Sequence, residues 1–128
     1  MVLVEIVTVL ALRQFVIFGI LVGRARGKYG VKAPAVSGNE MFERYYRVQM
    51  NTLELLVVFV PGLWLAARYW SPLLVGAIGV IYLLGRVLYF QAYVTEPAKR
   101  GPGFALSLGP ALVLLLASLA GAVMAGLK

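Results

Sequence analysis

The sequence predicts an all-α integral membrane protein, built as a bundle of four helices. Of its 128 residues, 62% are hydrophobic, and the mean hydropathy is +0.90, whereas an average soluble domain is about 45–50% apolar. The apolar residues form four stretches, each close to the roughly 20 residues that a helix needs to cross a bilayer. We therefore expect a single domain, residues 1–128, with spans at about 2–22, 41–69, 73–93 and 104–127.

The first span begins at the amino terminus and carries its positive charges after the apolar run, unlike a secretory signal, so it reads as a retained helix. The segment that follows, "GRARGKYGVKAPAVSGNE", is rich in Gly, Pro and positive charge and reads as a loop. The second span starts near Met41 and ends at "ARYWSP", where Tyr69 and Trp70 suit the membrane interface and Pro72 marks a turn. These signals set the limits of the first two spans.

The third span runs to Tyr93 and is followed by "TEPAKRGPG". We expect the prolines and glycines of this segment to break any helix, so that the fourth span begins at Phe104. Small residues in the third and fourth spans, among them Gly85 and Gly109, would allow helices to approach closely, within a subunit or between subunits.

Positive charge is concentrated in the segments after the first and third spans, while the intervening loop carries only Arg68. By the positive-inside rule both basic segments are cytoplasmic, and both termini face the opposite side. The formal net charge of +7 could also suit a nucleic-acid-binding protein, but such a protein needs a basic face on a soluble scaffold. The basic residues instead lie beside apolar runs: Arg24, Arg26, Lys28, Lys32, Lys99 and Arg100.

Cysteine and histidine are both absent. This excludes a protein thiolate nucleophile, a histidine general base and the usual zinc and haem ligands, so no metal site is expected. Chemistry at this chain must use arginine, tyrosine, carboxylates or a reactive group brought by the substrate.

Two polar stripes interrupt the apolar helices. Helical spacing places one on the second span, at Glu43, Arg47, Asn51 and Glu54, and one on the third, at Tyr82, Arg86, Tyr89 and Tyr93. Charged groups inside a bilayer cost roughly 2.5–3.5 kcal/mol each at the helix centre, so they face protein or water and find partners. Both stripes lie toward the same membrane face, where antiparallel helices would bring them together.

The stripes have a structural and a functional interpretation. Ion pairs of Glu43 with Arg47, or of Glu54 with Arg86, would merely fix the packing of helices, and Arg44 would be structural too. Alternatively, a cation, an amide and an anion at Arg47, Asn51 and Glu54 form a pocket for a ligand that carries carboxylate, peptide and ammonium groups. We favour the pocket for these three residues.

Other polar residues lie away from the stripes. Gln49 points to the opposite side of its helix from Arg47 and could serve the pocket of a neighbouring subunit. Arg13 and Gln14 are read as partners between helices, with Glu5 as the candidate partner of Arg13. Position alone makes Arg100 a positive anchor at the cytoplasmic rim.

Two motifs resemble a known family. "FERYYRVQMNTLE" is similar to the second-helix signature FER-x-x-R-x-Q-x-N-x-x-E of the MAPEG family, the membrane-associated proteins in eicosanoid and glutathione metabolism. "GRVLYFQAYVTEPAKR" resembles the family's third-helix and following-loop motif, with an arginine seven residues after the last tyrosine. The resemblance covers nearly the whole chain.

The resemblance implies a homotrimer that binds glutathione between subunits at the cytoplasmic end. One subunit would contact glutathione through Arg47, Asn51, Glu54, Tyr89 and Tyr93, and the neighbour would contribute Arg26 and Gln49. Arg100 matches the arginine that activates the glutathione thiol. The implied activity is a glutathione transferase, with peroxidase activity as a further expectation, acting on hydrophobic electrophiles or lipid hydroperoxides.

Departures from the family pattern keep alternatives open. Leu55 and Gly27 replace a tyrosine and an arginine of leukotriene C synthase, which weakens an assignment to leukotriene chemistry. The family's non-catalytic, lipid-binding branch is the alternative function, but it lacks arginines at the positions of Arg47 and Arg100. A small channel is a third hypothesis that rests only on intramembrane charge. We expect a bacterial inner membrane, with the active site toward the cytoplasm.

Overall fold

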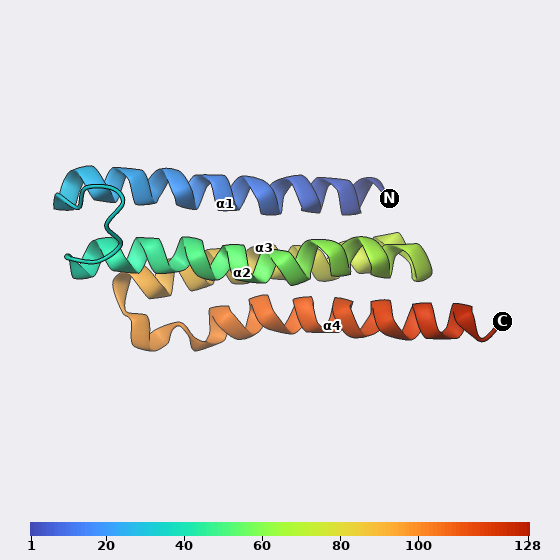
Figure 1. Ribbon diagram of the computed structural model, residues 1–128. Coiled ribbons are helices and arrows are strands. Elements are labelled where there is room, and N and C mark those ends of the chain that lie inside the picture. Colours follow the sequence, from blue (N-terminus) through green and yellow to red (C-terminus); the bar gives the residue numbers. More distant parts are fainter.

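The computed structural model describes residues 1–128 as four long helices, each antiparallel to the one before it (Figure 1). The helices are α1 (Val2–Tyr29), α2 (Glu40–Tyr69), α3 (Pro72–Thr95) and α4 (Gly101–Gly126), with a short 3-10 turn η1 (Pro97–Lys99) before α4. The pair α2 and α3 occupies the middle, and α1 and α4 flank it on opposite sides (Figure 1). All four are long and apolar enough to cross a membrane, which agrees with the predicted all-helical bundle.

The first helix is longer than the predicted span. It continues beyond Val22 to Tyr29, so the first seven residues of the segment that the sequence assigned to a loop are helical, and they include three of its four basic residues. Isolated glycines such as Gly23 and Gly27 cost a helix only about 1 kcal/mol each and do not end it. The helix ends at Gly30, whose left-handed φ of 70° is the usual conformation of a glycine cap.

The start of α4 also differs from the prediction. Gly101, Pro102 and Gly103, which were expected to break the helix, form its first turn. Proline is tolerated there because the first backbone N–H groups of a helix have no partner inside the helix. The starts of α2 and α3 carry side-chain caps, since Asn39 Oδ1 accepts from Phe42 N at 2.9 Å and Ser71 Oγ accepts from Leu74 N at 3.4 Å.

Glycines bring α3 and α4 into direct contact. A Cβ atom added at Gly85 would lie 2.6 Å from the backbone carbonyl of Leu106, and one added at Gly103 would overlap the backbone of Tyr89. This agrees with the packing role expected for Gly85, whereas Gly109 faces open space. The close contact places the beginning of α4, with Arg100 before it, against the end of α3.

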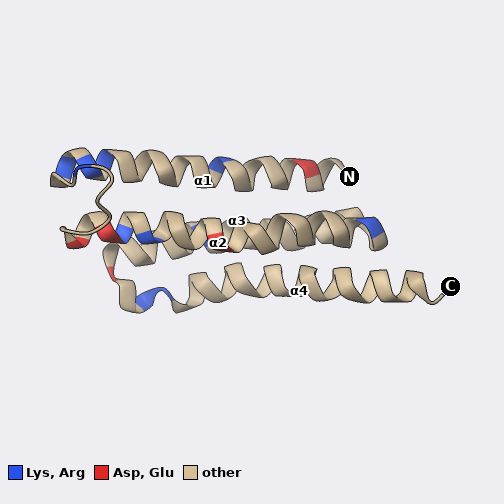
Figure 2. Cartoon of the chain, viewed as in Figure 1, with Lys and Arg blue, Asp and Glu red and all other residues tan.

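The charged residues collect at one end of the bundle, where α1 ends, α2 begins and α3 turns into α4 (Figure 2). We call this the polar end. Both basic segments lie there, as the charge pattern predicted, and the two chain termini lie at the other end (Figure 1). The exceptions include Arg13, which lies partway along α1, and Glu5, Arg68 and Lys128, which lie toward the other end.

Candidate functional site

Residues of both polar stripes surround a hollow near the polar end, which we call the inner hollow. Its volume is about 430 Å³, and its lining residues are Arg47, Asn51, Tyr89, Tyr93, Arg100 and Phe104. Two guanidinium groups and no carboxylate face it, so its field favours an anionic ligand. The structure therefore brings together five of the eight residues that the sequence assigned to the site.

Each side of the inner hollow comes from a different element. Arg47 and Asn51 are one turn apart on α2, and Tyr89 and Tyr93 are one turn apart on α3, with ring centroids 5.5 Å apart. Arg100 lies between η1 and α4, where its Nη1 donates to the carbonyl oxygen of Pro97 at 3.0 Å. Helical periodicity predicted the first two pairs, and the α3–α4 contact adds Arg100.

A buried arginine supports the hollow from inside the bundle. Arg86 is fully buried, and its Nη1 donates to Asn51 Oδ1 at 2.8 Å and to Thr52 Oγ1 at 3.1 Å, while its Nε donates to Ser107 Oγ at 2.9 Å. Its guanidinium carbon also lies 4.3 Å from the ring centroid of Tyr89. Arg86 therefore orients two residues of the inner hollow.

Neither of the two ion pairs predicted from the stripes, Glu43 with Arg47 and Glu54 with Arg86, is present in the structure. Arg86 does not contact Glu54 through an ion pair; instead Glu54 Oε1 lies 3.7 Å from Arg47 Nη1, with both side chains more than half exposed. Glu43 does not pair with Arg47 either, and its Oε2 accepts from Gly38 N at 3.3 Å. Glu54 lies beside the inner hollow without lining it.

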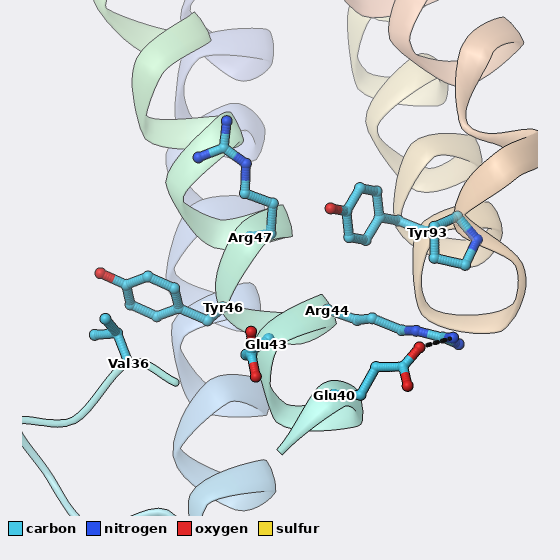
Figure 3. A pocket seen from close by; sticks show the side chains of 8 residues that line it. Val36, Glu40, Glu43, Arg44, Tyr46, Arg47 and Tyr93 are labelled. Atoms are coloured by element: carbon cyan, nitrogen blue, oxygen red, sulfur yellow. Dashed lines mark hydrogen bonds and ion pairs between the residues drawn. The ribbon is translucent and has the colours of Figure 1, made fainter. Parts of the chain in front are cut away.

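Figure 3 shows the residues that line a second hollow at the polar end, which we call the outer hollow. Its volume is about 420 Å³, and it is lined by Val36, Glu40, Glu43, Arg44, Tyr46, Arg47, Tyr93 and Pro97. The two hollows share Arg47 and Tyr93, and the ring of Tyr93 points toward Arg47 (Figure 3). Two glutamates balance two arginines here, so the excess positive charge belongs to the inner hollow.

Arg44 has the structural role that the sequence indicated. Its Nη2 lies 3.0 Å from Glu40 Oε1, and its Nη1 donates to the carbonyl oxygens of Val94 at 3.2 Å and Thr95 at 3.3 Å. It thus ties the start of α2 to the end of α3.

Arg26 and Gln49 lie outside both hollows of their own chain. Arg26 Nη1 donates to the carbonyl oxygen of Ala35 at 2.6 Å, and its guanidinium lies 4.8 Å from the ring centroid of Phe42. Gln49 packs against α1, where a Cβ atom added at Gly19 would lie 2.7 Å from its Nε2. Gln49 points away from Arg47 on α2, as helical periodicity predicted. A contact of Gln49 with the ligand in a neighbouring subunit stays a prediction.

In the first helix one expectation is confirmed and another is wrong. Gln14 Nε2 donates to the carbonyl oxygen of Leu83 at 2.9 Å, so Gln14 does link two helices. The three ion pairs of the chain include neither Arg13 nor Glu5.

Sequence reasoning missed three residues around the inner hollow. Phe104 lines it, and Thr52 and Ser107 bond to Arg86 beneath it. Hydroxyl groups inside two apolar helices are a signal that a polar partner is buried nearby. Which partner they bind depends on how α2, α3 and α4 are arranged, so the pattern alone does not name Arg86.

Comparison with known proteins agrees with this geometry. The family model described as the MAPEG family matches residues 4–120. The chain belongs to the MAPEG family. Its two MAPEG-like motifs, one in the first half of α2 and one from α3 to Arg100, meet in space around the two hollows.

Individual relatives cover most of the chain. Human microsomal glutathione S-transferase 2 is 40% identical over 95% of this chain and 81% of its own length. An uncharacterized protein of Synechocystis is 47% identical over 89% of this chain and 83% of its own length. Leukotriene C4 synthase of Cavia porcellus is 34% identical over 91% of this chain and 79% of its own length. MAPEG membership and four apolar helices make this chain an integral, multi-pass membrane protein.

Proposed function

We propose that this MAPEG protein is a membrane-bound glutathione transferase that joins the glutathione thiolate to lipophilic electrophiles. The observation that supports it most is the inner hollow, where Arg47 and Arg100 face a common space with an amide and two phenol groups and no carboxylate. Relatives named microsomal glutathione S-transferase 2 and leukotriene C4 synthase support the same class of reaction.

The chemical groups of glutathione suit these side chains. It carries two carboxylates, an ammonium group, two peptide groups and a thiol. Arg47 would bind a carboxylate, Glu54 the ammonium group, and Asn51, Tyr89 and Tyr93 the remaining polar groups. In the proposed homotrimer Arg26 and Gln49 would come from the neighbouring subunit.

Arg100 would lower the energy of the reactive form of glutathione. A free thiol has a pKa of about 8.5 and is mostly protonated at neutral pH, and an adjacent guanidinium favours the thiolate. Arginine remains protonated, so the thiol proton passes to water rather than to Arg100. The thiolate then forms a bond to the electrophilic carbon while the leaving group departs with its electron pair.

A lipid hydroperoxide could also react in the same place, which would be the peroxidase activity. The thiolate attacks the terminal peroxide oxygen to form glutathione sulfenic acid as the O–O bond breaks, and the lipid alkoxide leaves and takes a proton from water to give the alcohol. A second glutathione then reduces the sulfenic acid to glutathione disulfide and water. The co-substrate would enter from the bilayer, and the polar end would face the cytoplasm of a bacterial inner membrane.

Replacing Arg100 tests the proposal. Arg100→Ala should reduce conjugation of glutathione to a halonitroarene by about 10²–10³-fold, because it removes a preorganised charge from the transition state. Calorimetry should show glutathione affinity within a few-fold of the unmodified protein, and the ultraviolet absorbance of bound thiolate should disappear. Lys99→Ala is the matched control, since Lys99 pairs with Glu96 and lies outside both hollows.

The same measurements would expose the alternative. If the unmodified protein neither binds nor turns over glutathione but binds fatty acids saturably, the transferase proposal is wrong. A non-catalytic, lipid-binding scaffold would then be the better interpretation.

A further inference from the structure

Arg13 is an intramembrane charge without a partner in its own chain. It is exposed, and it lies eleven residues from either Val2 or Arg24, which is about 16 Å along the helix axis. That distance exceeds what an arginine side chain can bridge to the membrane surface. Because a central arginine costs roughly 2.5–3.5 kcal/mol to insert, a partner outside this chain should compensate it.

Glu54 lies at nearly the same depth as Arg13. Gly19 packs against Gln49, and Trp64 Nε1 donates to Thr8 Oγ1 at 2.8 Å, so these contacts set the alignment of α1 with α2. Counting from them along the antiparallel helices, Glu54 is level with about residues 14–18 of α1, or roughly 2–8 Å from Arg13 along the axis. The other four glutamates lie nearer the helix ends: Glu5, Glu40, Glu43 and Glu96.

The two side chains face outward from the bundle. The buried residues of α1, among them Val7 and Ala11, form the face that packs into the core. Arg13 comes two residues after Ala11, which turns it about 200° around the helix and away from that face. Glu54 is 61% exposed, and its only cation, Arg47, is 3.7 Å away and 55% exposed.

Arg13 lines a hollow of about 230 Å³ between α1 and α3, together with Gln14 and Leu83, while Glu54 on α2 pairs with Arg47. Since α1 lies at an edge of the bundle (Figure 1) and Arg13 is exposed, Arg13 is accessible to another molecule.

We infer that Arg13 of one copy pairs with Glu54 of a neighbouring copy. A symmetry axis along the membrane normal leaves the depth of every residue unchanged, so two groups at the same depth in one chain can meet between chains. Opposite charge at one depth identifies the occupant as a second copy of this chain. The inference extends the proposed function, on whose assembly of several copies it rests.

The pair would also prepare the site for its ligand. In a single chain Glu54 is held by Arg47, one of the two guanidiniums of the inner hollow. When the neighbour's Arg13 binds one carboxylate oxygen of Glu54, Arg47 is released to bind a carboxylate of the ligand, and the second oxygen of Glu54 stays free for the ligand's ammonium group. Arg13 is therefore a positioning residue that acts through Glu54 and Arg47.

A charge swap tests the pair through assembly, without glutathione. In native mass spectrometry of detergent-solubilised protein, Arg13→Glu and Glu54→Arg should each weaken association at least about tenfold, because each places like charges together. The double variant should recover to within about threefold of the unmodified protein. Arg68→Glu is the control, because it changes an exposed arginine at the other end of α2 and should leave association unchanged. Undisturbed association in both single variants, or no recovery in the double variant, would overturn the pair.

A photo-crosslinking benzoylphenylalanine at position 13 tests proximity directly. Irradiated membranes should give a covalent dimer whose attachment point, mapped by mass spectrometry, lies within one turn of Glu54 in the other copy. The matched control places the probe at Ile6, which is exposed on the same face of α1 two turns closer to the amino terminus. This probe should attach about 10 Å closer to the carboxyl end of α2 than the probe at position 13. Attachment at position 13 only to lipid, or only within the same chain, contradicts the inference.

The two proposals fail separately. If the double variant restores association but the protein does not bind glutathione, the pair stands and the transferase proposal falls. If the unmodified protein turns over glutathione but the double variant does not regain association, only the Arg13–Glu54 pair is wrong. An effect of Arg13→Gln confined to the affinity for acidic co-substrates, with association unchanged, would make Arg13 a substrate contact instead.

Discussion

Arg86 shows how a single buried residue shapes the candidate site. Its partners are neutral: Asn51, Thr52 and Ser107 accept its hydrogen bonds, and no carboxylate pairs with it. The hydroxyls of Thr52 and Ser107 also donate to backbone carbonyls at 2.8 Å and 2.7 Å, so they keep a partner when Arg86 is removed. Asn51 depends on Arg86 for the orientation of its amide oxygen.

We expect Arg86→Met to affect ligand binding more than stability. The substitution keeps apolar volume and leaves chiefly Asn51 without its hydrogen bond, so the free energy of unfolding should fall by about 1–2 kcal/mol. Glutathione affinity should fall about tenfold, which corresponds to one misplaced hydrogen bond. Thermal unfolding followed by the fluorescence of Trp64 and Trp70, together with calorimetry, measures both. A large loss of stability with unchanged affinity would reduce Arg86 to a packing role.

Elements were predicted well in number and order and less well at their ends. Apolar runs separated by Gly and Pro define four helices because hydrophobic length is a strong signal. The ends depend on caps, and α1 continues through two glycines to the left-handed Gly30, while α4 begins at Gly101 with a proline in its first turn. A glycine or proline therefore marks a boundary only in combination with the backbone conformation around it.

Close contact of α3 with α4 should be sensitive to a single methyl group. Gly85→Ala places a Cβ atom 2.6 Å from the Leu106 carbonyl, so the helices must separate, at a cost of about 1–3 kcal/mol. Because Arg100 precedes α4, conjugation activity should fall as well. Gly109→Ala on α4, the other helix of the pair, is the control, because no neighbouring atom lies within 4 Å of its added Cβ atom. Equal thermal midpoints for the two variants would contradict this account of the contact.

At the scale of the molecule, charge and apolar surface divide the protein along its length. The polar end holds both hollows and both basic segments, where Figure 2 shows most of the charged residues, and the rest of the bundle has many exposed large apolar side chains. In the proposed function, this division would let a water-soluble thiol and a lipophilic co-substrate reach one place from opposite sides.

The positive-inside rule predicts the orientation of this molecule in a bacterial membrane. Alkaline phosphatase fused after Lys128 should be active, because the carboxyl terminus lies at the end opposite the basic segments and would be periplasmic (Figure 1). A fusion after Lys99 should be inactive because the enzyme would stay in the cytoplasm. Measured phosphatase activity per fusion protein gives the answer, and the reverse pattern would invert the proposed orientation.

The amino-acid sequence was sufficient for the membrane class, the four helices, the two polar stripes and the MAPEG resemblance, because each depends on composition or on periodicity within one segment. Partners across segments required the tertiary structure. Glu54 lies by Arg47 rather than Arg86, and Arg86 binds Asn51, because the relative rotation and depth of α2, α3 and α4 decide which groups meet. Arg13 has no ion partner in its own chain for the same reason, since it lies on the side of α1 opposite the buried residues that face the core.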